Sequence, residues 1–323
     1  MGHILPLDFA TLNFSGEIRK GYGEDSWSYG FTRHAGMIAV FDGCGGSGSR
    51  QHSIYNNHTE AYMASRLCSG TVYESMHSCF FSNITAETFT KQVLEKALSI
   101  RIGSNALPPE AFKVKLKGLR TLPTTMASVL IQCAETDELL ISPIWAGDSR
   151  AYILDATGLS QISVDDSTQK NPLESVTGVI TNIISGDAPI NLNYRVYRVK
   201  PPFMVLVVTD GCYESVATPM ELEGMILHTM LESTNVAQWE ENLRNLIGDY
   251  AHDDHTLCLA SFGYESFDNI QRIFSKRYET LRKEFLEPVW AVSREDNESR
   301  RHLCDQYRPN YMKFIEGDDG KWT

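Results

Sequence analysis

Five acidic residues stand at the ends of expected β-strands, where their side chains could do metal chemistry. Asp42 and Asp210 each follow an apolar run and are each followed by glycine, while Glu24, Asp25 and Asp253 each precede an expected strand. Carboxylates that meet beyond the end of a sheet repel one another unless a cation neutralises them. Ligand sets made only of oxygen suit Mg²⁺ or Mn²⁺. The pattern therefore indicates a divalent-metal site.

A turn is the alternative interpretation of an Asp-Gly pair, because both residue types are common in turns. A single pair would favour the turn. Here the pair occurs twice, each time after an apolar run, and acidic residues stand near both ends of the block that contains the two pairs. This combination favours the metal site.

The chain up to residue 263 contains strands and helices that could position these acids. The runs expected to form strands are 11–19, 26–34, 37–41, 126–133, 139–146, 150–154, 203–209 and 256–262. We expect residues 50–117 to be mostly helical, a capping box at Thr218 to start one helix and 236–250 to form another, while 159–200 is loop-rich. Runs of strands separated by helix pairs, without regular β-α-β alternation, favour an α+β fold with largely antiparallel sheets.

Six short elements, taken in order, resemble those of one enzyme family. They are Gly23-Glu24-Asp25-Ser26, the run from Ile38 to Gly46 with its Asp42-Gly43, Thr124-Thr125-Met126-Ala127, Ala146-Gly147-Asp148-Ser149-Arg150-Ala151-Tyr152, Val207-Val208-Thr209-Asp210-Gly211 and Asp253-Asp254-His255-Thr256. Through them the chain resembles the PPM family of metal-dependent Ser/Thr protein phosphatases, also called the PP2C type, over about residues 10–263. The resemblance implies an αββα sandwich of two largely antiparallel sheets flanked by helices, with metal ions in a cleft at one end.

The resemblance also implies the roles of the acidic residues. In the family, the aspartate of the first Asp-Gly pair bridges two metal ions, which implies this role for Asp42 and implies Mg²⁺ or Mn²⁺ as the cofactor. The other ligands of metal or metal-bound water that it implies are Glu24, Asp25, Gly43 through its carbonyl, Asp210 and Asp253. The catalytic set is then Asp42, Asp210 and Asp253, and a hydroxide activated by the two ions attacks phosphorus without a covalent phosphoenzyme. Asp148 and Arg150 are expected to support a hairpin and the core.

Phosphate binding requires a choice between two neighbouring residues. The family's phosphate-binding arginine usually stands five positions before the aspartate of the Glu-Asp pair. Here that position holds Lys20, and Arg19 stands six positions before Asp25. A one-residue bulge at Gly21 and Gly23 would bring Arg19 into place. Arg19 is favoured, because arginine binds phosphate bidentately whereas lysine is a point charge.

Three further places depart from the family pattern. Cys44 stands where eukaryotic members carry a His and bacterial members commonly carry Met, so the chain resembles a bacterial-type member. Its thiol is interpreted either as redox-sensitive or as a packed small residue. Many members bind a third metal ion with two further aspartates. In this chain the first of these positions falls near Arg120 and the second holds Glu214, which makes a third ion doubtful. Pro123 replaces a glycine before Thr124.

Composition limits which binding partners and which cellular compartment we expect for the protein. The chain has 29 basic and 41 acidic residues and a net charge of −12, which disfavours nucleic-acid binding through phosphate neutralisation. No apolar run is long enough to span a membrane, and the N-terminus lacks the pattern of a secretory signal. Seven irregularly spaced cysteines favour free thiols. We therefore expect a cytoplasmic protein that binds neither nucleic acid nor membrane.

Three functions remain open. The leading hypothesis is hydrolysis of phosphoserine and phosphothreonine on a phosphorylated protein substrate, with a cognate Ser/Thr kinase as a further partner by analogy. The second is a weakly active or inactive regulatory protein on the same fold. This hypothesis predicts that other residues replace the metal ligands, whereas Asp42, Asp210 and Asp253 are all present. The third is a small-molecule phosphomonoesterase, which the polar segment 163–200 does not discriminate from the first.

The domain organisation follows from a change of composition after Gly263. Residues 1–263 are expected to form the phosphatase-like domain and residues 264–323 a C-terminal helical extension. The extension is rich in Glu, Arg and Lys, with apolar residues spaced as in amphipathic helices. We interpret it as packing on the core or, alternatively, as docking a partner kinase or substrate.

Overall fold

The computed structural model describes residues 5, 7–80, 84–106, 118–134, 137–168, 171, 173, 178–293 and 296–317. Part of the expected helical segment 50–117, residues 107–117, lies outside the described residues, as do residues 318–323 of the expected extension.

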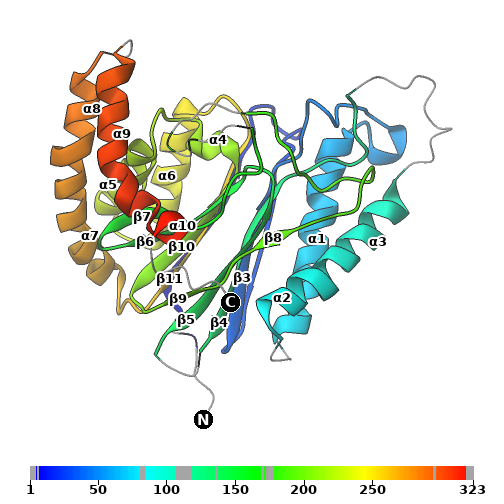
Figure 1. Cartoon of the computed structure of the whole chain (residues 1–323), viewed down its shortest axis with the longest axis horizontal. Helices are drawn as coiled ribbons and strands as arrows, with labels where there is room; N and C mark the ends of the chain where they lie inside the picture. Colours follow the sequence, from blue (N-terminus) through cyan, green and yellow to red (C-terminus); the bar gives the residue numbers. More distant parts are fainter. Residues whose placement is uncertain are drawn as a thin grey trace.

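Two antiparallel sheets form the centre of the molecule (Figure 1). Sheet A has the strand order β1 (Leu7–Gly16), β11 (His255–Phe262), β10 (Phe203–Val208), β6 (Arg150–Asp155) and β7 (Gly158–Gln161). Sheet B has the order β2 (Ser26–Phe31), β3 (Ala35–Phe41), β4 (Met126–Cys133), β5 (Leu139–Ala146) and β8 (Asn193–Tyr194), and β9 (Tyr197–Val199) also pairs with β5.

Helices cover the outer face of each sheet (Figure 1). The helices that cover sheet B are α1 (Glu60–Phe80), α2 (Ala86–Thr88), a π-helical turn at Phe89–Leu94 and α3 (Glu95–Asn105), preceded by a 3₁₀ turn at Ser53–Tyr55. Those on the side of sheet A are α4 (Asp210–Tyr213), α5 (Pro219–Leu231), α6 (Val236–Tyr250), α7 (Phe267–Leu281), a π-helical turn at Arg282–Leu286, α8 (Glu287–Ala291), α9 (Asn297–Tyr311) and α10 (Lys313–Glu316). The expected αββα sandwich with C-terminal helices is confirmed.

The continuous apolar runs of the sequence are strands buried on both faces. In β3, Met37, Ala39 and Phe41 pack toward α1 to α3, while Ile38 and Val40 pack into the core between the two sheets. Successive side chains of a strand point to opposite faces. A strand covered by helices on one side and by a sheet on the other therefore needs apolar residues at every position, and β10 follows the same rule.

Strand register gathers the acidic segments at one end of both sheets. Ser26 pairs with Phe41, so the residue before β2 lies beside the residue after β3. Val208 pairs with Leu257, so the segment after β10 lies beside the segment before β11. Antiparallel pairing thus places the start of one strand and the end of its neighbour at the same edge.

The strand predictions differ from the structure mainly at their ends. The strands expected at 126–133 and 139–146 are confirmed as β4 and β5. The prediction of 11–19 is wrong at its C-terminal end, because β1 ends at Gly16 and a turn follows. Strands β7, β8 and β9 were not predicted, since segments of 4, 2 and 3 residues are too short to show a periodicity.

The C-terminal helices share a hydrophobic core with α5, α6 and sheet A. Phe274 and Leu281 of α7 and Tyr307 and Tyr311 of α9 belong to the same buried cluster as Ile226 of α5. Of the two interpretations of the extension, packing on the core is what the structure shows for these helices.

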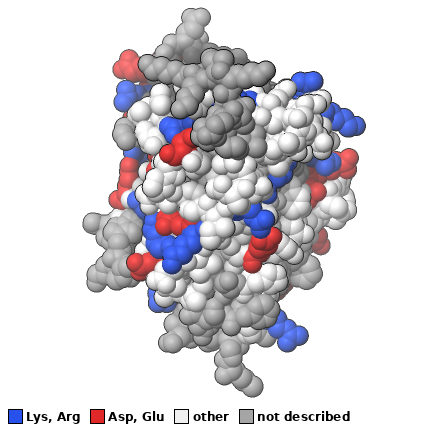
Figure 2. Space-filling view, turned by 90° about the vertical axis from the view of Figure 1, so that its right-hand side faces the viewer, with Lys and Arg blue, Asp and Glu red and all other residues white. Residues whose placement is uncertain are grey.

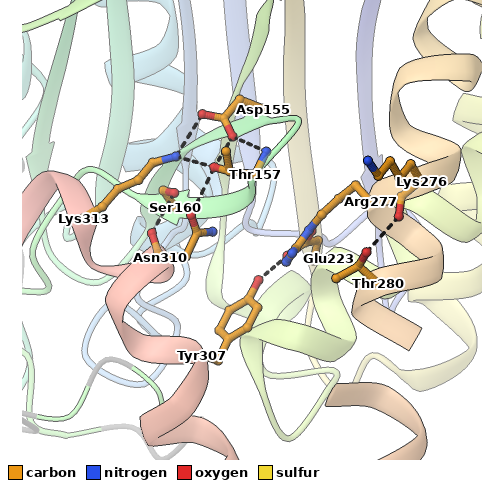
Figure 3. A network of polar contacts seen from close by, with 10 residues as sticks. All are labelled: Asp155, Thr157, Ser160, Glu223, Lys276, Arg277, Thr280, Tyr307, Asn310 and Lys313. Atoms are coloured by element: carbon orange, nitrogen blue, oxygen red, sulfur yellow. Dashed lines mark hydrogen bonds and ion pairs between the residues drawn. The ribbon is translucent and has the colours of Figure 1, made fainter. Parts of the chain in front are cut away.

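A buried ion pair fastens α7 to α5. Arg277 Nε lies 2.6 Å from Glu223 Oε1, and its Nη2 donates to Glu223 Oε2 at 3.0 Å. The side chain of Glu223 is fully buried and that of Arg277 is 9% exposed. The hydroxyl of Tyr307 donates to the same carboxylate, so Glu223 receives hydrogen bonds from both α7 and α9 (Figure 3).

A second set of contacts holds the end of α9 and the start of α10 against sheet A (Figure 3). Lys313 Nζ lies 2.8 Å from Asp155 Oδ2, and it donates to the hydroxyl of Thr157 at 2.8 Å. The hydroxyl of Ser160 donates to the backbone carbonyl of Asn310 at 2.9 Å. These contacts fix the C-terminal helices to the β6–β7 hairpin.

Two observations, one on the helices and one on the surface charge, concern the expected absence of membrane and nucleic-acid binding. Among the described residues, none of the helices combines the length and apolar character that crossing a membrane requires. On the face formed by α1 to α3, acidic and basic side chains are interspersed (Figure 2).

We expect Arg277→Ala to lower the free energy of unfolding by about 3–5 kcal/mol, because it leaves the buried carboxylate of Glu223 without its charged partner. Urea unfolding monitored by circular dichroism measures this. Lys276→Ala on the exposed side of the same helix is the matched control, with an expected change within about 0.5 kcal/mol. Equal losses in the two variants would show that the ion pair contributes nothing specific.

Candidate active site

The predicted acids lie together at the end of the sandwich where the strand register gathers them. Their exposure increases from the interior outward: Asp25 is 4% exposed, Glu24, Asp42 and Asp210 are half-buried, and Asp253 is exposed. The cluster therefore runs from a buried floor to a solvent-facing rim. This arrangement would let a phosphate ester approach from one side.

Asp25 forms the floor and is held by hydroxyl groups. The hydroxyl of Thr209 donates to Asp25 Oδ2 at 2.7 Å, and Thr256 also hydrogen-bonds to this carboxyl group. Burial nevertheless raises the pKa of Asp25 to about 7, and the negative charges of Asp254 and Asp253 add to the rise. The hydroxyls therefore offset only part of the cost of burying this carboxylate.

Asp42 and Asp210 are the two central acids. Burial raises the pKa of each well above its ordinary value. The charge of Asp210 raises the pKa of Asp42 further, and the charges of Asp148 and Glu214 raise that of Asp210. The backbone carbonyl of Asp42 accepts hydrogen bonds from the hydroxyl of Thr124 at 2.7 Å and from the amide of Thr125 at 2.8 Å. The Thr-Thr element thus fixes the backbone from which Asp42 projects.

The glycines of the two Asp-Gly pairs are required by close backbone approach. A Cβ atom on Gly43 would lie 2.5 Å from the carbonyl oxygen of Ala61, and one on Gly211 would lie 2.0 Å from the carbonyl oxygen of Asp254. Neither glycine has a positive φ. The alternative interpretation of these pairs as ordinary turns is therefore not supported.

Glu24 lies at the edge of the cluster beside helix α1. Its carboxylate accepts a hydrogen bond from the hydroxyl of Thr59, and its amide donates to Asp254 Oδ2 at 2.7 Å. Burial raises the pKa of Glu24, the Thr59 bond opposes the rise, and the charges of Asp254 and Asp253 reinforce it. The nearby guanidinium of Arg66 lowers the pKa, so α1 contributes positive charge to this edge.

Asp148 and Glu214 extend the acidic cluster toward α5. Burial raises the pKa of Asp148 to about 6, with Asp165 contributing, and raises that of Glu214 to about 7, with Asp148 contributing. Asp148 Oδ1 and Glu214 Oε1 are buried and have no hydrogen-bond partner within the described part of the chain. Arg120, the other position considered for a third ion, is exposed.

Arg150 links the acidic cluster to the C-terminal helices. Its guanidinium binds Asp165 at 2.7–3.2 Å and lies 3.8 Å from the ring centroid of Tyr213. Asp165 also accepts from Gln161 Nε2 at 3.0 Å, and Gln161 Oε1 accepts from the hydroxyl of Tyr311 at 2.9 Å. This supports the structural role expected for Arg150, whereas Asp148 belongs to the acidic cluster itself.

The two candidate phosphate-binding residues follow the end of β1. Arg19 and Lys20 are both exposed, in a turn where Gly21 has a φ of 81°. The Arg19 guanidinium lies 3.9 Å from the ring centroid of Tyr22.

The Tyr22 ring continues into a stack that ends at α1. It lies 5.6 Å from the ring of His58, which stacks at 3.8 Å on Tyr62, and the guanidinium of Arg66 lies 3.6 Å from the Tyr62 centroid. Stacking restrains a guanidinium without neutralising it. The stack therefore has one arginine at each end, and the one on α1, Arg66, is close enough to Glu24 to lower its pKa.

Cys44 is favoured as a packed residue. Burial raises the pKa of its thiol well above the ordinary value, and Asp42, Asp148 and Asp210 raise it further. The thiolate is the reactive form of cysteine, so a thiol held protonated by surrounding acids is a poor nucleophile. Its amide donates to the carbonyl of Pro123 at 3.2 Å, which gives that proline a place in the wall of the site.

The described part of segment 163–200 is hydrogen-bonded to the site. Asp166 accepts from the amide of Gly147 at 3.2 Å and from the side chains of Asn182 and Asn193 at 2.9 and 2.8 Å. Ile184 exchanges two backbone hydrogen bonds with Thr124, both 3.0 Å. These contacts tie the segment to the Thr-Thr and Gly-Asp-Ser-Arg elements.

The donor set fits divalent cations in its chemistry. All its side-chain donors are oxygen, as Mg²⁺ and Mn²⁺ prefer, and the raised pKa values show like charges that a cation would relieve. Two buried carboxylate oxygens are also unpartnered. As placed, however, the described His, Cys, Asp and Glu side chains include no group of three that could hold one ion. The acids are thus neighbours whose side chains do not converge on one point.

The sequence assigned no role to four residues of the site. Thr209 stands directly before Asp210, Asp254 directly after Asp253, and Thr256 three positions after Asp253, so proximity to a predicted ligand was the available signal. Thr59 had no such signal, because it is 35 residues away from Glu24 in the chain.

Comparisons with known proteins extend this picture. A family model for protein phosphatase 2C matches residues 17–248, and a comparison with curated protein sequences finds no match. The serine/threonine phosphatase Stp1 from Staphylococcus aureus superposes with a TM-score of 0.56 at 17% identity, over 81% of this chain and 98% of that one. The Mycobacterium tuberculosis serine/threonine phosphatase PstP/Ppp gives 0.54 at 18% identity, over 80% and 99%.

A third structure is the catalytic domain of the serine threonine protein phosphatase PstP in complex with 2 manganese ions. It gives a TM-score of 0.53 at 17% identity, over 78% of this chain and 96% of that one. At these identities the likeness shows a shared fold. The superpositions cover almost the whole of these structures but leave about a fifth of this chain outside.

The raised pKa values predict how stability depends on pH. Asp25, Asp148 and Glu214 have pKa values of about 7, 6 and 7 in the fold, against ordinary values of 3.8, 3.8 and 4.5. Between about pH 4 and 7 the folded state holds more protons than the unfolded state, so the stability that these groups contribute falls as pH rises. In EDTA we expect the melting temperature to fall by several degrees from about pH 5 to about pH 7.5, at roughly 2 °C per kcal/mol.

Differential scanning calorimetry in matched buffers measures this fall. Mn²⁺ binds ionised carboxylates, so its stabilising effect should be larger at the higher pH. Asp148→Asn, which does not titrate, should flatten the profile in EDTA. A wild-type profile that rises over this window, with no change in the Asn variant, would contradict the assignment of buried, mutually repelling acids.

Proposed function

The chain belongs to the protein phosphatase 2C family, and we propose that it hydrolyses phosphoserine and phosphothreonine in proteins with two Mg²⁺ or Mn²⁺ ions as cofactors. The observation that carries the proposal is the pairing of Asp42 and Asp210, two half-buried acids at the end of both sheets, where the charge of Asp210 adds to the rise in the pKa of Asp42. The manganese complex of the PstP catalytic domain supports the choice of ions.

The residues that would hold the ions are Asp42, the carbonyl of Gly43, Asp210 and Asp253, with Glu24 and Asp25 supporting metal or metal-bound water. When bound, such ions activate water and neutralise the charge of a phosphate ester. The protein's part is to fix the ligands. Thr124 and Thr125 hold the backbone of Asp42, and Thr209 orients the carboxyl group of Asp25.

Phosphate binding is proposed for Arg19 rather than Lys20. The cation–π contact with Tyr22 restrains the Arg19 guanidinium while leaving its donors available. A planar guanidinium can donate two hydrogen bonds to one phosphate, which an ammonium does not match in geometry. Arg66 at the other end of the stack is the second positive charge near Glu24.

We also propose the cellular setting and the domain division. The cysteines that the structure describes are free thiols, which supports a reducing compartment such as the cytoplasm. A cognate Ser/Thr kinase would supply the phosphorylated substrate. Residues 1–263 would form the catalytic domain and 264–323 a unit packed on it, since α7 to α9 bury apolar residues against α5.

We expect Asp42→Ala to reduce Mn²⁺-dependent hydrolysis of p-nitrophenyl phosphate to background. Changes that only support a metal ligand cost about 10–100-fold, so loss of the ligand shared by both proposed ions should cost more. Asp305→Ala, an exposed acid on α9, is the matched control and should keep wild-type turnover. Undiminished, Mn²⁺-dependent turnover in a folded Asp42→Ala protein would refute the site. Absence of turnover in the wild type, with Mn²⁺ bound, would refute the function.

We expect Arg19→Ala to raise KM for a phosphothreonine peptide by roughly tenfold or more, since a charge-assisted hydrogen bond is worth about 1.5–3 kcal/mol. Lys20→Ala should change KM by less, because the Lys20 side chain is exposed and an ammonium binds phosphate only as a point charge. Steady-state kinetics at saturating Mn²⁺ measure both variants. A larger effect at Lys20 would reverse the assignment.

A further inference from the structure

A wide cleft lies between the phosphatase fold and its C-terminal helices. Its walls are α5, the C-terminal part of α6 and the loop after α4 on one side, and α8 and α9 on the other. Its volume is about 1280 Å³, which exceeds the roughly 300–1,000 Å³ of pockets for single small ligands. The size suits a stretch of polypeptide better than one small molecule.

The cleft begins where the candidate active site ends. Glu214, four residues after Asp210, lines it, and so does His252, which directly precedes Asp253. The negative charges of Asp148 and Asp253 also raise the pKa of Glu214. Asp42, Asp210 and Asp253 do not line the cleft themselves. A chain whose phosphoresidue lay at the acids could therefore continue into it.

The C-terminal helices give the cleft an apolar wall and a positive charge. Leu286 and Val289 form part of the wall, and Trp290, at the lip, is 61% exposed. Arg300 and Arg301 of α9 line the cleft, and neither side chain forms an ion pair with a described residue.

Arginines without an ion-pair partner among the described residues are unexpected in a chain with 41 acidic residues against 29 basic ones. The acidic residues that line the cleft lie on its other wall, and the carboxylate of one of them, Glu221, already accepts hydrogen bonds from Ala217 and Thr218 at 3.1 and 3.0 Å. Charge complementarity therefore favours an acidic occupant on the side of α9. An exposed Trp beside arginines is also typical of residues that anchor a partner.

We propose that this cleft binds the segment flanking the phosphoresidue of a protein substrate and prefers segments that combine an apolar residue with acidic residues. The proposal rests on the proposed function and names its substrate class. Trp290 and the apolar wall receive the apolar side chain, and Arg300 and Arg301 pair with the acidic ones. Because α8 and α9 supply these groups, selectivity depends on the C-terminal helices, whereas the chemistry depends on the acids of the two sheets.

Peptide binding tests this independently of turnover. The probes are fluorescein-labelled peptides with a non-hydrolysable phosphonate analogue of phosphothreonine, flanked on the N-terminal or C-terminal side by Leu and two Glu, or by Leu and two Lys. Fluorescence anisotropy with the full chain and Mn²⁺ should show at least about tenfold tighter binding of one Glu peptide than of its Lys counterpart. Arg300→Glu/Arg301→Glu should abolish or reverse this preference, and Trp290→Ala should weaken both peptides.

The control is Arg272→Glu, an equal charge change on exposed α7 outside the cleft, which should keep the preference. p-Nitrophenyl phosphate, too small to reach the cleft, should be turned over by all variants within about twofold of wild type. No discrimination between Glu and Lys peptides, or equal loss of discrimination in Arg272→Glu, would overturn the cleft proposal alone. Lack of Mn²⁺-dependent turnover in the wild type would instead overturn the proposed function, while the anisotropy result still decides the cleft.

Discussion

The mutual repulsion of Asp25, Asp42 and Asp210 is the constraint on which this end of the molecule depends. Each carboxyl group is raised in pKa by burial and by its neighbours, so the fold must hold together groups that would separate in a flexible chain. It does so through backbone geometry. Antiparallel register in both sheets brings the strand ends to one edge, and the glycines after the two central acids allow contacts that any Cβ would block. The acidic cluster is therefore a property of the whole sandwich.

A second layer of contacts carries this order outward to the C-terminal helices. Arg150 joins Asp165, which joins Gln161, which joins Tyr311 of α9. The chain of contacts is largely buried, with Asp165 partly exposed, so Arg150, Gln161 and Tyr311 depend on their neighbours for partners. The C-terminal helices therefore do more than cover apolar surface. They complete a polar network that reaches Arg150, two residues after Asp148. This physical link ties them to the sandwich that forms the proposed catalytic domain.

The sequence predicted what is local and missed what is remote. Asp42 could be placed at a strand end because the continuous apolar run of β3 is contained in seven residues. The glycine after it was singled out for turn formation or metal binding, and the structure adds a close backbone contact with α1 that the sequence did not indicate. Contacts between distant segments left no pattern: Arg277 meets Glu223 across 54 residues. The turn that places Arg19 likewise depends on where β1 ends, which a loose alternation did not define.

The buried carboxylate of Glu223 has a consequence for the order in which the chain can fold during synthesis. Its hydroxyl donor, Tyr307, is made 84 residues later. At roughly 5–20 residues per second, the ribosome needs about 4–17 seconds to add them. During that interval α5 exists with an ionisable group on the face that α7 and α9 will cover, and water must remain there. Of the five acids of the proposed metal site, four are synthesised before this interval begins, and Asp253 follows during it. The site therefore emerges from the ribosome ahead of the helices that enclose its supporting core.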